Sequence, residues 1–316
     1  MPASHRIVLA LPLLLGLLVT GCSKQTSSVA PTAGGNSDQQ AQVASVLSDN
    51  PTLVDEDVAE PTDQTELSWT GAELSANASL GARIRPLTFW RTIRGVERRF
   101  EFAFADTDSA GQPTAVVVTV HKFFTGTFNI LVADSVGEGE PPQAHVIHKP
   151  LHDHWVRRLL LRRVRVAEEG GRALWRLVAT SGVKITARDA TTHIQSLRIQ
   201  SAGLDTTVTD PLAFFRLRAI LKLELGADVT LTATTDRADD VVLLYVRGHR
   251  ARFHNNGDGT YSAAFRAPDL AGVRHLGVDA LSHGTLFDET APYDSQAWIE
   301  PYLVHPIAIA AGTPDR

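Results

Sequence analysis

The stretch "RFEFAFAD", residues 99–106, decides the fold class of this chain of 316 residues. Phe100, Phe102 and Phe104 alternate with charged and small residues, so an extended backbone turns the three rings to one side and Glu101 to the other. Strict alternation of this kind is typical of a β-strand that buries one face and leaves the other in water. The stretch therefore predicts antiparallel β-structure.

Similar runs continue to about residue 211 and predict a β domain over residues 87–211. They are "AVVVTVHKFF" (115–124), "TFNILVAD" (127–134), "HWVRRLLLRRVRV" (154–166), "ALWRLVAT" (173–180), "VKITARD" (183–189), "HIQSLRIQ" (193–200) and "DTTVTD" (205–210). We expect a hairpin turn at Thr125–Gly126 and a tight connection at "EEGG" (168–171), because glycine accepts turn conformations without a steric penalty. No long helical pattern interrupts these runs, which argues against alternating β and α elements.

A second β domain is expected over residues 212–306, before a C-terminal tail at 307–316. Its runs are "PLAFFRLRAI" (211–220), "ADVTLTATTD" (227–236), "DVVLLYVRG" (240–248), "HRARFHN" (249–255), "DGTYSAAFRAP" (258–268), "GVRHLGVDAL" (272–281) and "AWIEPYLV" (297–304). About seven short strands suffice for an immunoglobulin-like sandwich. The stretch "NNGDGTYSAAFRAPDLAGVRHLGVDA" (255–280) also resembles the middle of bacterial immunoglobulin-like modules. The chain is therefore predicted to be all-β, with two antiparallel domains, the second an immunoglobulin-like sandwich.

The N-terminus has the layout of a secretory signal. Arg6 precedes an apolar run over residues 7–20, which is short for a membrane span. The sequence Val19-Thr20-Gly21-Cys22 then resembles the lipobox of bacterial lipoproteins, in which signal peptidase cuts before the cysteine. The resemblance implies a signal peptide at 1–21, a diacylglyceryl thioether on Cys22 and an acylated amino group.

Lipidation of Cys22 would leave no thiol, because it is the only cysteine in the chain. Disulfides, thiolate catalysis and zinc–thiolate sites are then excluded. The acyl chains make the membrane a lasting partner. In enterobacterial lipoproteins an aspartate after the cysteine favours the inner membrane. Ser23 at this position therefore implies, by that resemblance, the outer membrane of a bacterial envelope, facing the periplasm or the cell surface.

Residues 22–86 are expected to form a flexible acidic tether between membrane and body. From Gln25 to Ala82 there are nine acidic residues and no lysine or arginine. Small and polar residues dominate its start, as in flexible linkers. A short helix is expected over Gln39–Leu47, since Asn50–Pro51 would end it.

The segment "HVIHKPLHDH" (145–154) is the candidate metal site. His152 and His154 are two apart and would point the same way in a strand, and His148 would join them across a turn at Lys149–Pro150. The competing interpretation is an exposed, histidine-rich hairpin connection, because no distant motif completes a ligand set. No cofactor is expected under that interpretation.

Two further patterns have a structural explanation. "NNGDGT" (255–260) is similar to a calcium loop, but position twelve from Asn255 is Arg266 where an EF-hand requires glutamate, so a glycine-rich turn is expected. Arginines between 157 and 165 are expected to pair with carboxylates on an open sheet face. Nucleic acid is excluded as a partner because the exported chain carries a net charge of −5.

The chain as a whole resembles a loose group of bacterial envelope lipoproteins that has no assigned activity. The matching stretches are "FWRTI" (89–93), "VTDPL" (208–212) and "GTLFDETAPYDSQAWIEPYLV" (284–304), besides the lipobox and the acidic tether. No motif of a serine hydrolase, zinc protease, P-loop or dinucleotide site is present, so an enzyme has no positive support. The expected function is adhesion, scaffolding or protein binding at the envelope. The alternatives are metal binding through residues 145–154, and a hydrolase without a recognisable motif.

Overall fold

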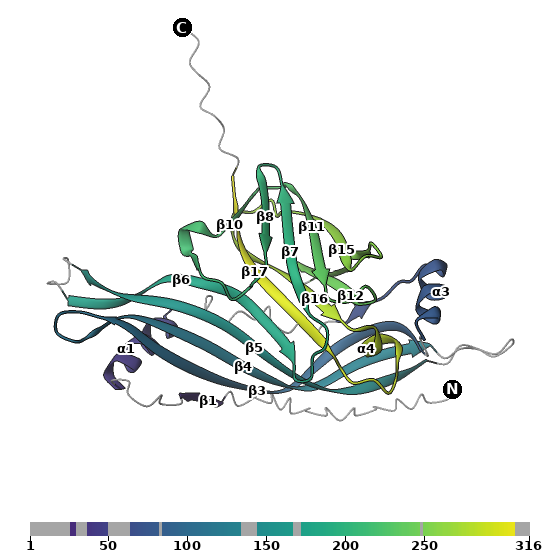
Figure 1. The fold of residues 1–316 in the computed structure, drawn as a ribbon, viewed down its shortest axis with the longest axis horizontal. Helices are drawn as coiled ribbons and strands as arrows, with labels where there is room; N and C mark the ends of the chain where they lie inside the picture. Colours follow the sequence, from purple (N-terminus) through teal and green to yellow (C-terminus); the bar gives the residue numbers. More distant parts are fainter. Residues whose placement is uncertain are drawn as a thin grey trace, which may run out of the picture.

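The computed structural model describes residues 26–29, 37–49, 64–81, 84–133, 144–166, 172–246 and 249–306. The protein is all-β, as predicted, with two sheets whose strand pairs are antiparallel apart from β1–β3 and β10–β17. The larger sheet runs in the order β1-β3-β4-β5-β6-β17-β16-β12-β13, and β2, β9 and β10 pair off this path. The smaller sheet has the order β14-β15-β11-β7-β8. Figure 1 shows the second sheet standing above the long strands of the first.

The elements have the following bounds. The larger sheet contains β1 (Thr26–Val29), β2 (Thr65–Glu66), β3 (Arg85–Thr107), β4 (Pro113–Ala133), β5 (Ala144–Val166), β6 (Arg172–Ala187), β9 (Phe215–Arg216), β10 (Leu221–Glu224), β12 (Val241–Val246), β13 (His249–Arg252), β16 (Gly272–Leu281) and β17 (Ser295–His305). The smaller contains β7 (Ile194–Ser201), β8 (Leu204–Val208), β11 (Asp228–Thr235), β14 (His254–Asn255) and β15 (Thr260–Arg266). The helices are α1 (Ser37–Ser48), α3 (Gly71–Ser79), α4 (His283–Phe287) and the 3₁₀ turn η3 (Leu217–Ala219).

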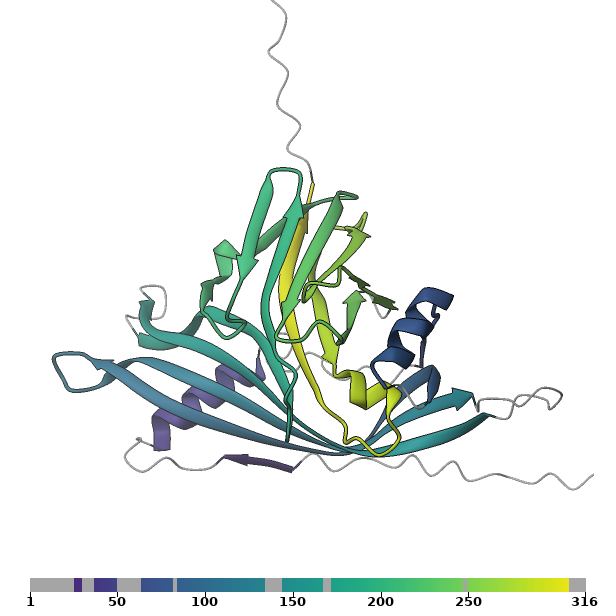
Figure 2. The same cartoon turned by 45° about the vertical axis from the view of Figure 1, so that its right-hand side comes forward.

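The strands β3 to β6 form a long curved platform, one face of which is buried. Phe100, Phe102 and Phe104 lie opposite Val120, Val118 and Val116 of β4, so the alternation that opened the sequence analysis is confirmed. Their apolar core continues into α1, α4 and the loop before β17. We call this buried side of β3–β6 the inner face. Figures 1 and 2 show the second sheet above the middle of the platform, with α1 toward one end and α3 toward the other.

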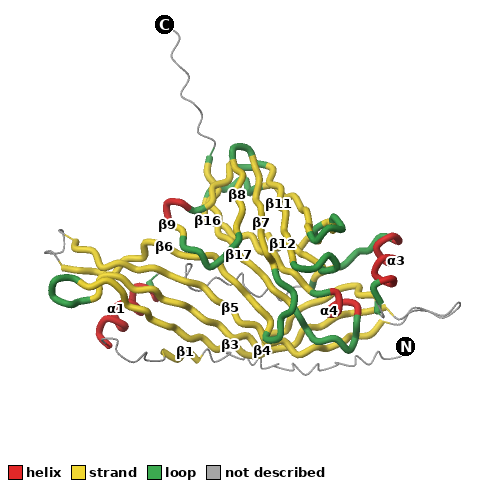
Figure 3. The backbone as a smooth tube through the Cα atoms, in the orientation of Figure 1, coloured by secondary structure: helices red, strands yellow, loops and turns green. Residues whose placement is uncertain are grey.

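The hairpin expected at Thr125–Gly126 is wrong. Both residues lie inside β4, which continues without a break from Pro113 to Ala133, and Figure 3 shows β3, β4 and β5 as long uninterrupted strands. The glycine has another purpose: a Cβ on Gly126 would overlap the backbone carbonyl of Thr92. The register of β3 against β4 shifts between Ile93 and Gly95, so the glycine admits a close approach at a β-bulge.

The boundary expected between residues 211 and 212 does not separate two β units. Strand β7, from the first predicted domain, pairs with β11 of the second, with Ile199 opposite Leu231. Strand β17 in turn pairs with β6, with Ile299 opposite Val183. A β-sandwich is present, but β7 and β8 supply part of one of its sheets and the other sheet continues into the platform. A fragment that begins at residue 212 would lack those strands.

Parts of the expected tether pack against the body. Helix α1 covers the stretch where a short helix was expected, but Val43 and Leu47 are buried in the core. Gln39 accepts a hydrogen bond from Nε1 of Trp175 at 3.0 Å. The polar composition indicated a tether because only one stripe of the helix is apolar. That stripe is the one that contacts the body. The signal peptide (1–21), Cys22, residues 50–63 and the tail 307–316 lie outside the described residues.

The turn at residues 256–259 has the structure that its glycines predict. Gly257 and Gly259 have φ angles of 86° and 83°, which glycine accepts without strain. Oδ1 of Asp258 accepts hydrogen bonds from the backbone N and from Oγ1 of Thr260, at 3.0 and 2.6 Å. The aspartate thus has the turn role expected of it.

Replacement of Gly126 by alanine should strongly destabilise the protein. The new Cβ would force the β3 and β4 backbones apart at the bulge, with an expected loss of about 3 kcal/mol in the free energy of unfolding. Gly71→Ala is the matched control, because a Cβ there meets nothing within 4 Å and the residue starts α3. Urea unfolding followed by circular dichroism measures both. A similar midpoint for the two variants would contradict the close approach.

Candidate functional site

The candidate histidine segment is not a hairpin connection but the middle of β5. Lys149 and Pro150 lie within the strand, opposite Phe128 and Thr127 of β4. His148, His152 and His154 share the face of β5 that points away from the core, as their even spacing predicts. The turn that would fold His148 back toward the other two is therefore absent.

The three histidines have different neighbours. Nδ1 of His148 is 2.7 Å from Oδ1 of Asn129, whereas Nε2 of His154 is 2.9 Å from Nδ1 of His121 on β4. In an extended strand four residues span about 13 Å, so His148 and His152 are too far apart to share an ion. Within the described ranges no three His, Cys, Asp or Glu side chains are grouped as metal ligands would be.

His154 instead belongs to a stack of rings on the outer face of the platform. Its ring lies parallel to Phe123 with a centroid distance of 4.5 Å, and His121 follows at 5.2 Å from His154. Arg99 lies over Phe123, 5.1 Å from the ring centroid. Burial lowers the pKa of His154, and the neighbouring His121 lowers it further. The pairing with His121 could not be read from the sequence, because that residue lies 33 positions earlier on another strand.

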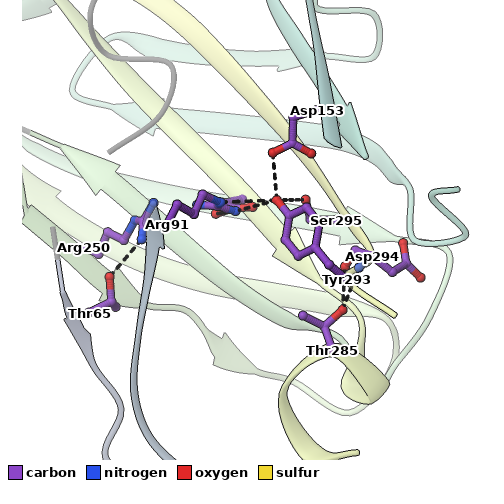
Figure 4. Close-up of polar contacts among 9 residues, drawn as sticks. Thr65, Arg91, Asp153, Arg250, Thr285, Tyr293, Asp294 and Ser295 are labelled. Atoms are coloured by element: carbon purple, nitrogen blue, oxygen red, sulfur yellow. Dashed lines mark hydrogen bonds and ion pairs between the residues drawn. The ribbon is translucent and has the colours of Figure 1, made fainter. Parts of the chain in front are cut away.

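A polar network lies inside the core, between the platform and the sandwich (Figure 4). Nη2 of Arg91 is 2.8 Å from Oδ2 of Asp279, and both side chains are more than nine-tenths buried. The hydroxyl of Tyr293 accepts hydrogen bonds from Nε and Nη2 of Arg91, both at 3.2 Å, and from Ser295 at 2.7 Å. It donates to Oδ2 of Asp153 at 3.0 Å. The network thus joins β3, β5, β16 and the loop before β17.

The loop that carries Tyr293 is itself held by hydrogen bonds. Asp294 accepts from the backbone N and the hydroxyl of Thr191, at 2.9 and 2.6 Å, and its backbone N donates to Thr285. Nζ of Lys149 donates to the carbonyls of Gly284 and Asp288, at 3.2 and 2.7 Å. Burial lowers the pKa of Lys149 to about 8. Lys149 of β5 therefore holds α4 and the residue that follows it against the platform.

The cavity beside this network is about 30 Å³ in volume, enough for one or two water molecules. Arg91, Asp153, Asp279 and Tyr293 all line it. Two carboxyl groups, a phenol and a guanidinium are thus close together, but the cavity between them is too small for an organic substrate. The arrangement forms a polar connection between the two layers.

The arginines between 157 and 165 do not behave as a single exposed set. Arg157 is fully buried on the inner face, where its Nε donates to Oγ1 of Thr180 at 3.1 Å. Arg158 points to the other side and lies 4.7 Å from the ring centroid of Phe214. The open face expected for these arginines is therefore wrong for Arg157, which alternation places inside, and on the other side an aromatic ring lies against Arg158.

An open groove lies between α3 and one end of the sandwich, with a volume of about 420 Å³. Its walls are formed by α3, by residues 238–242 and by the segment from Arg252 to Asn255, and Trp69 and Tyr261 also line it. This volume is within the usual range of small-molecule sites. A hollow of about 490 Å³ beside the β7–β8 turn has no aromatic residue in its wall.

Three side chains fix α3 against the sandwich. One carboxylate oxygen of Glu73 accepts from the backbone N of Thr70 at 2.8 Å, which completes a capping box at the start of α3. The other oxygen is 2.7 Å from Nη2 of Arg252. The guanidinium of Arg252 lies 4.3 Å from the ring centroid of Trp69. The groove could not be predicted from the sequence, because α3 lies in the expected tether and Arg252 comes 179 positions after Glu73.

Comparisons with protein-family models, curated proteins and solved structures gave no significant match to this chain. Among the described residues no helix is both long and apolar enough to cross a membrane. The function must therefore be argued from the geometry of the network, the histidine stack and the groove.

The buried pair of Arg91 and Asp279 should matter far more for stability than an exposed pair in the same sheet. Asp279→Asn removes the negative charge that lies 2.8 Å from the Arg91 guanidinium in the core, and we expect a loss of about 3–5 kcal/mol. Glu97→Gln removes the partner of Arg99, a pair of similar length in which both side chains are about half exposed, and should cost less than about 1 kcal/mol. Chemical unfolding of both variants makes the comparison. Equal losses would show that the network does not hold the layers together.

A second buried carboxylate makes stability depend on pH. Burial raises the pKa of Glu300 to about 8, although the positive charge of Arg157 opposes the rise. The unfolded side chain releases its proton near pH 4.5, so the folded protein holds an extra proton between pH 4.5 and pH 8 and loses stability as pH rises through that window. Glu300→Gln removes this term. Relative to the wild type, the variant should gain on the order of 3 kcal/mol between pH 5 and pH 9. Parallel stability–pH curves for the two proteins would contradict the assignment.

Proposed function

We propose that this protein is a lipid-anchored, non-catalytic binding protein of the bacterial cell envelope, held through Cys22. The observation that carries the binding role is the open groove beside α3, which has a volume of about 420 Å³. The cavity beside the buried network of Arg91, Asp153, Asp279 and Tyr293 has only about 30 Å³. The volume of the groove is within the range of small-molecule binding sites.

The position of β1 supports a short connection to the anchor. Thr26 to Val29 pair with Glu97 to Phe100 at the edge of the platform. Thr26 is only four residues after Cys22, and four residues reach at most about 14 Å. With Cys22 lipidated, the β3 edge would lie close to the membrane surface. The anchor would then orient the platform, in place of the long spacer that the composition indicated.

We also propose that the sandwich is a variant of the immunoglobulin-like class. Its two sheets enclose a continuous apolar core that includes Leu197, Leu231, Val278 and Trp298. The variation lies in its edges: β17 continues into β6, and the β7–β8 hairpin precedes the predicted module in the chain. The outer membrane is the destination that we propose from Ser23.

Cys22→Ser should abolish membrane attachment, since serine cannot form the thioether that carries the diacylglyceryl group. After phase separation of whole-cell extracts in a clouding detergent, the wild type should partition into the detergent phase and the variant into the aqueous phase or an uncleaved pool. Ser23→Ala is the matched control, because it changes the next residue and leaves the thiol. Wild-type-like partitioning of Cys22→Ser would refute the lipoprotein proposal.

A further inference from the structure

The wall of the groove beside α3 contains two neighbouring carboxylates that form no ion pair with the described residues. Asp239 and Asp240 end the loop between β11 and β12, and both line the groove. Asp240 is 3% exposed, and its Oδ1 accepts from Oγ1 of Thr192 at 3.3 Å. Its Oδ2 has no hydrogen-bond partner in the described part of the chain. A buried carboxylate oxygen in that state favours a ligand that donates a hydrogen bond.

The guanidinium that lines the groove is already engaged. Arg252 pairs with Glu73 at 2.7 Å and lies over Trp69, so it serves to hold α3. Three carboxylates therefore share this groove with one guanidinium, and that guanidinium is bound to the third of them, Glu73. The surplus negative charge is concentrated on the sandwich wall, where it favours a cationic ligand.

The opposite wall supplies apolar surface. Ala72 and Ala76 are the small residues of α3 that line the groove, and Leu80 at its end is 55% exposed. Phe253 and Val241 continue the apolar lining on the sandwich side. An aliphatic chain fits along this surface, while a bare metal ion leaves it unused. The described residues also form no cluster of three metal-ligating side chains.

We propose that the groove binds an aliphatic primary ammonium, with the charged nitrogen between Asp239 and Asp240 and the carbon chain along α3. The inference rests on the proposed binding function and names its ligand class. An ammonium group donates three hydrogen bonds, so it can satisfy Oδ2 of Asp240 and a carboxylate oxygen of Asp239 together. Lysine side chains and free alkylamines share this chemistry.

Proton release provides a signature that a purely structural carboxylate would not give. Burial raises the pKa of Asp240 to about 7; the hydrogen bond from Thr192 opposes the rise, and the charges of Asp239 and Asp236 add to it. Tyr261 and His283 also lie near this acidic loop. Burial, with the charge of Asp240, raises the pKa of Tyr261. Burial lowers the pKa of His283, and the charge of Asp239 opposes that lowering. A bound ammonium favours the ionised carboxyl, so binding at pH 7 should release protons and affinity should increase from pH 6 to pH 8.

The test is isothermal titration calorimetry of the detergent-solubilised full chain with three probes of equal length: hexylammonium, hexan-1-ol and hexanoate. Hexylammonium should bind at least about tenfold more tightly than hexanol, and hexanoate should bind most weakly. Nα-acetyllysine amide, run beside them, distinguishes a lysine side chain from a free amine as the preferred source. Repeating the hexylammonium titration in two buffers of different ionisation enthalpy measures the protons released.

Two variants and one control locate the site. Asp239→Asn and Asp240→Asn should each weaken hexylammonium binding about tenfold, and Asp240→Asn should also abolish proton release. Asp205→Asn removes one negative charge from the β7–β8 hairpin, outside the groove, and should leave the affinity unchanged. Asp239→Asn keeps the test valid should Asp240→Asn fail to fold, since Asp239 is more exposed.

Equal affinities for hexylammonium and hexanol, or binding that persists in Asp239→Asn and Asp240→Asn, would overturn the ammonium assignment. Failure of the assignment and failure of the binding function differ in outcome. Binding of a neutral disaccharide that is lost in Ala76→Trp, a variant in which the indole fills the groove, would support the binding function but not the proposed ammonium ligand. Absence of binding by the ammonium, alcohol, carboxylate and disaccharide probes would count against both.

Discussion

The architecture depends on one short ladder, the pairing of β17 with β6 from Gln296–Thr186 to Ile299–Val183. The platform of β3 to β6 buries a broad apolar face and cannot do so alone, because each of its strands needs a second layer against that face. The ladder turns the larger sheet from platform into sandwich, so that the chain folds back over its own inner face. The network of Arg91, Asp279 and Tyr293 then fixes the angle between the two parts at the point where they meet.

The fold class follows from residues whose environment is local. Phe100, Phe102 and Phe104 alternate over a strand, and their burial on one face needed no knowledge of the partner strand. Gly126 shows where that reasoning fails. A glycine between two apolar runs is typical of a turn, and its actual role is to admit the carbonyl of Thr92 from a strand that comes 34 positions earlier. The local pattern of one strand does not show which distant strand will approach it closely.

The same limit applies to the sites. His152 and His154 were correctly placed on one face by their spacing, whereas the turn expected to bring His148 to them is absent because β5 continues through Lys149 and Pro150. The contact that defines His154 comes from His121 on β4. The burial of Arg91 could have been predicted, because it follows Phe89 by two positions and so shares the buried face of the strand. A buried charge requires a partner. Its partners could not be predicted, because Asp279 and Tyr293 come from a distant part of the chain. The groove depends on α3, which Arg252 attaches to the sandwich through its contacts with Glu73 and Trp69.

The placement of β17 as the last strand has a kinetic consequence. Strands β3 to β6 are joined in chain order, so their contacts have low sequence separation and close early, whereas Val183 must wait for Ile299 and Arg91 for Asp279. Folding then has a late step in which the sandwich closes over a preformed platform. Until β16 and β17 are available, the inner face of the platform remains open to water and to other chains. The time at which these two strands pair thus sets the lifetime of the aggregation-prone intermediate.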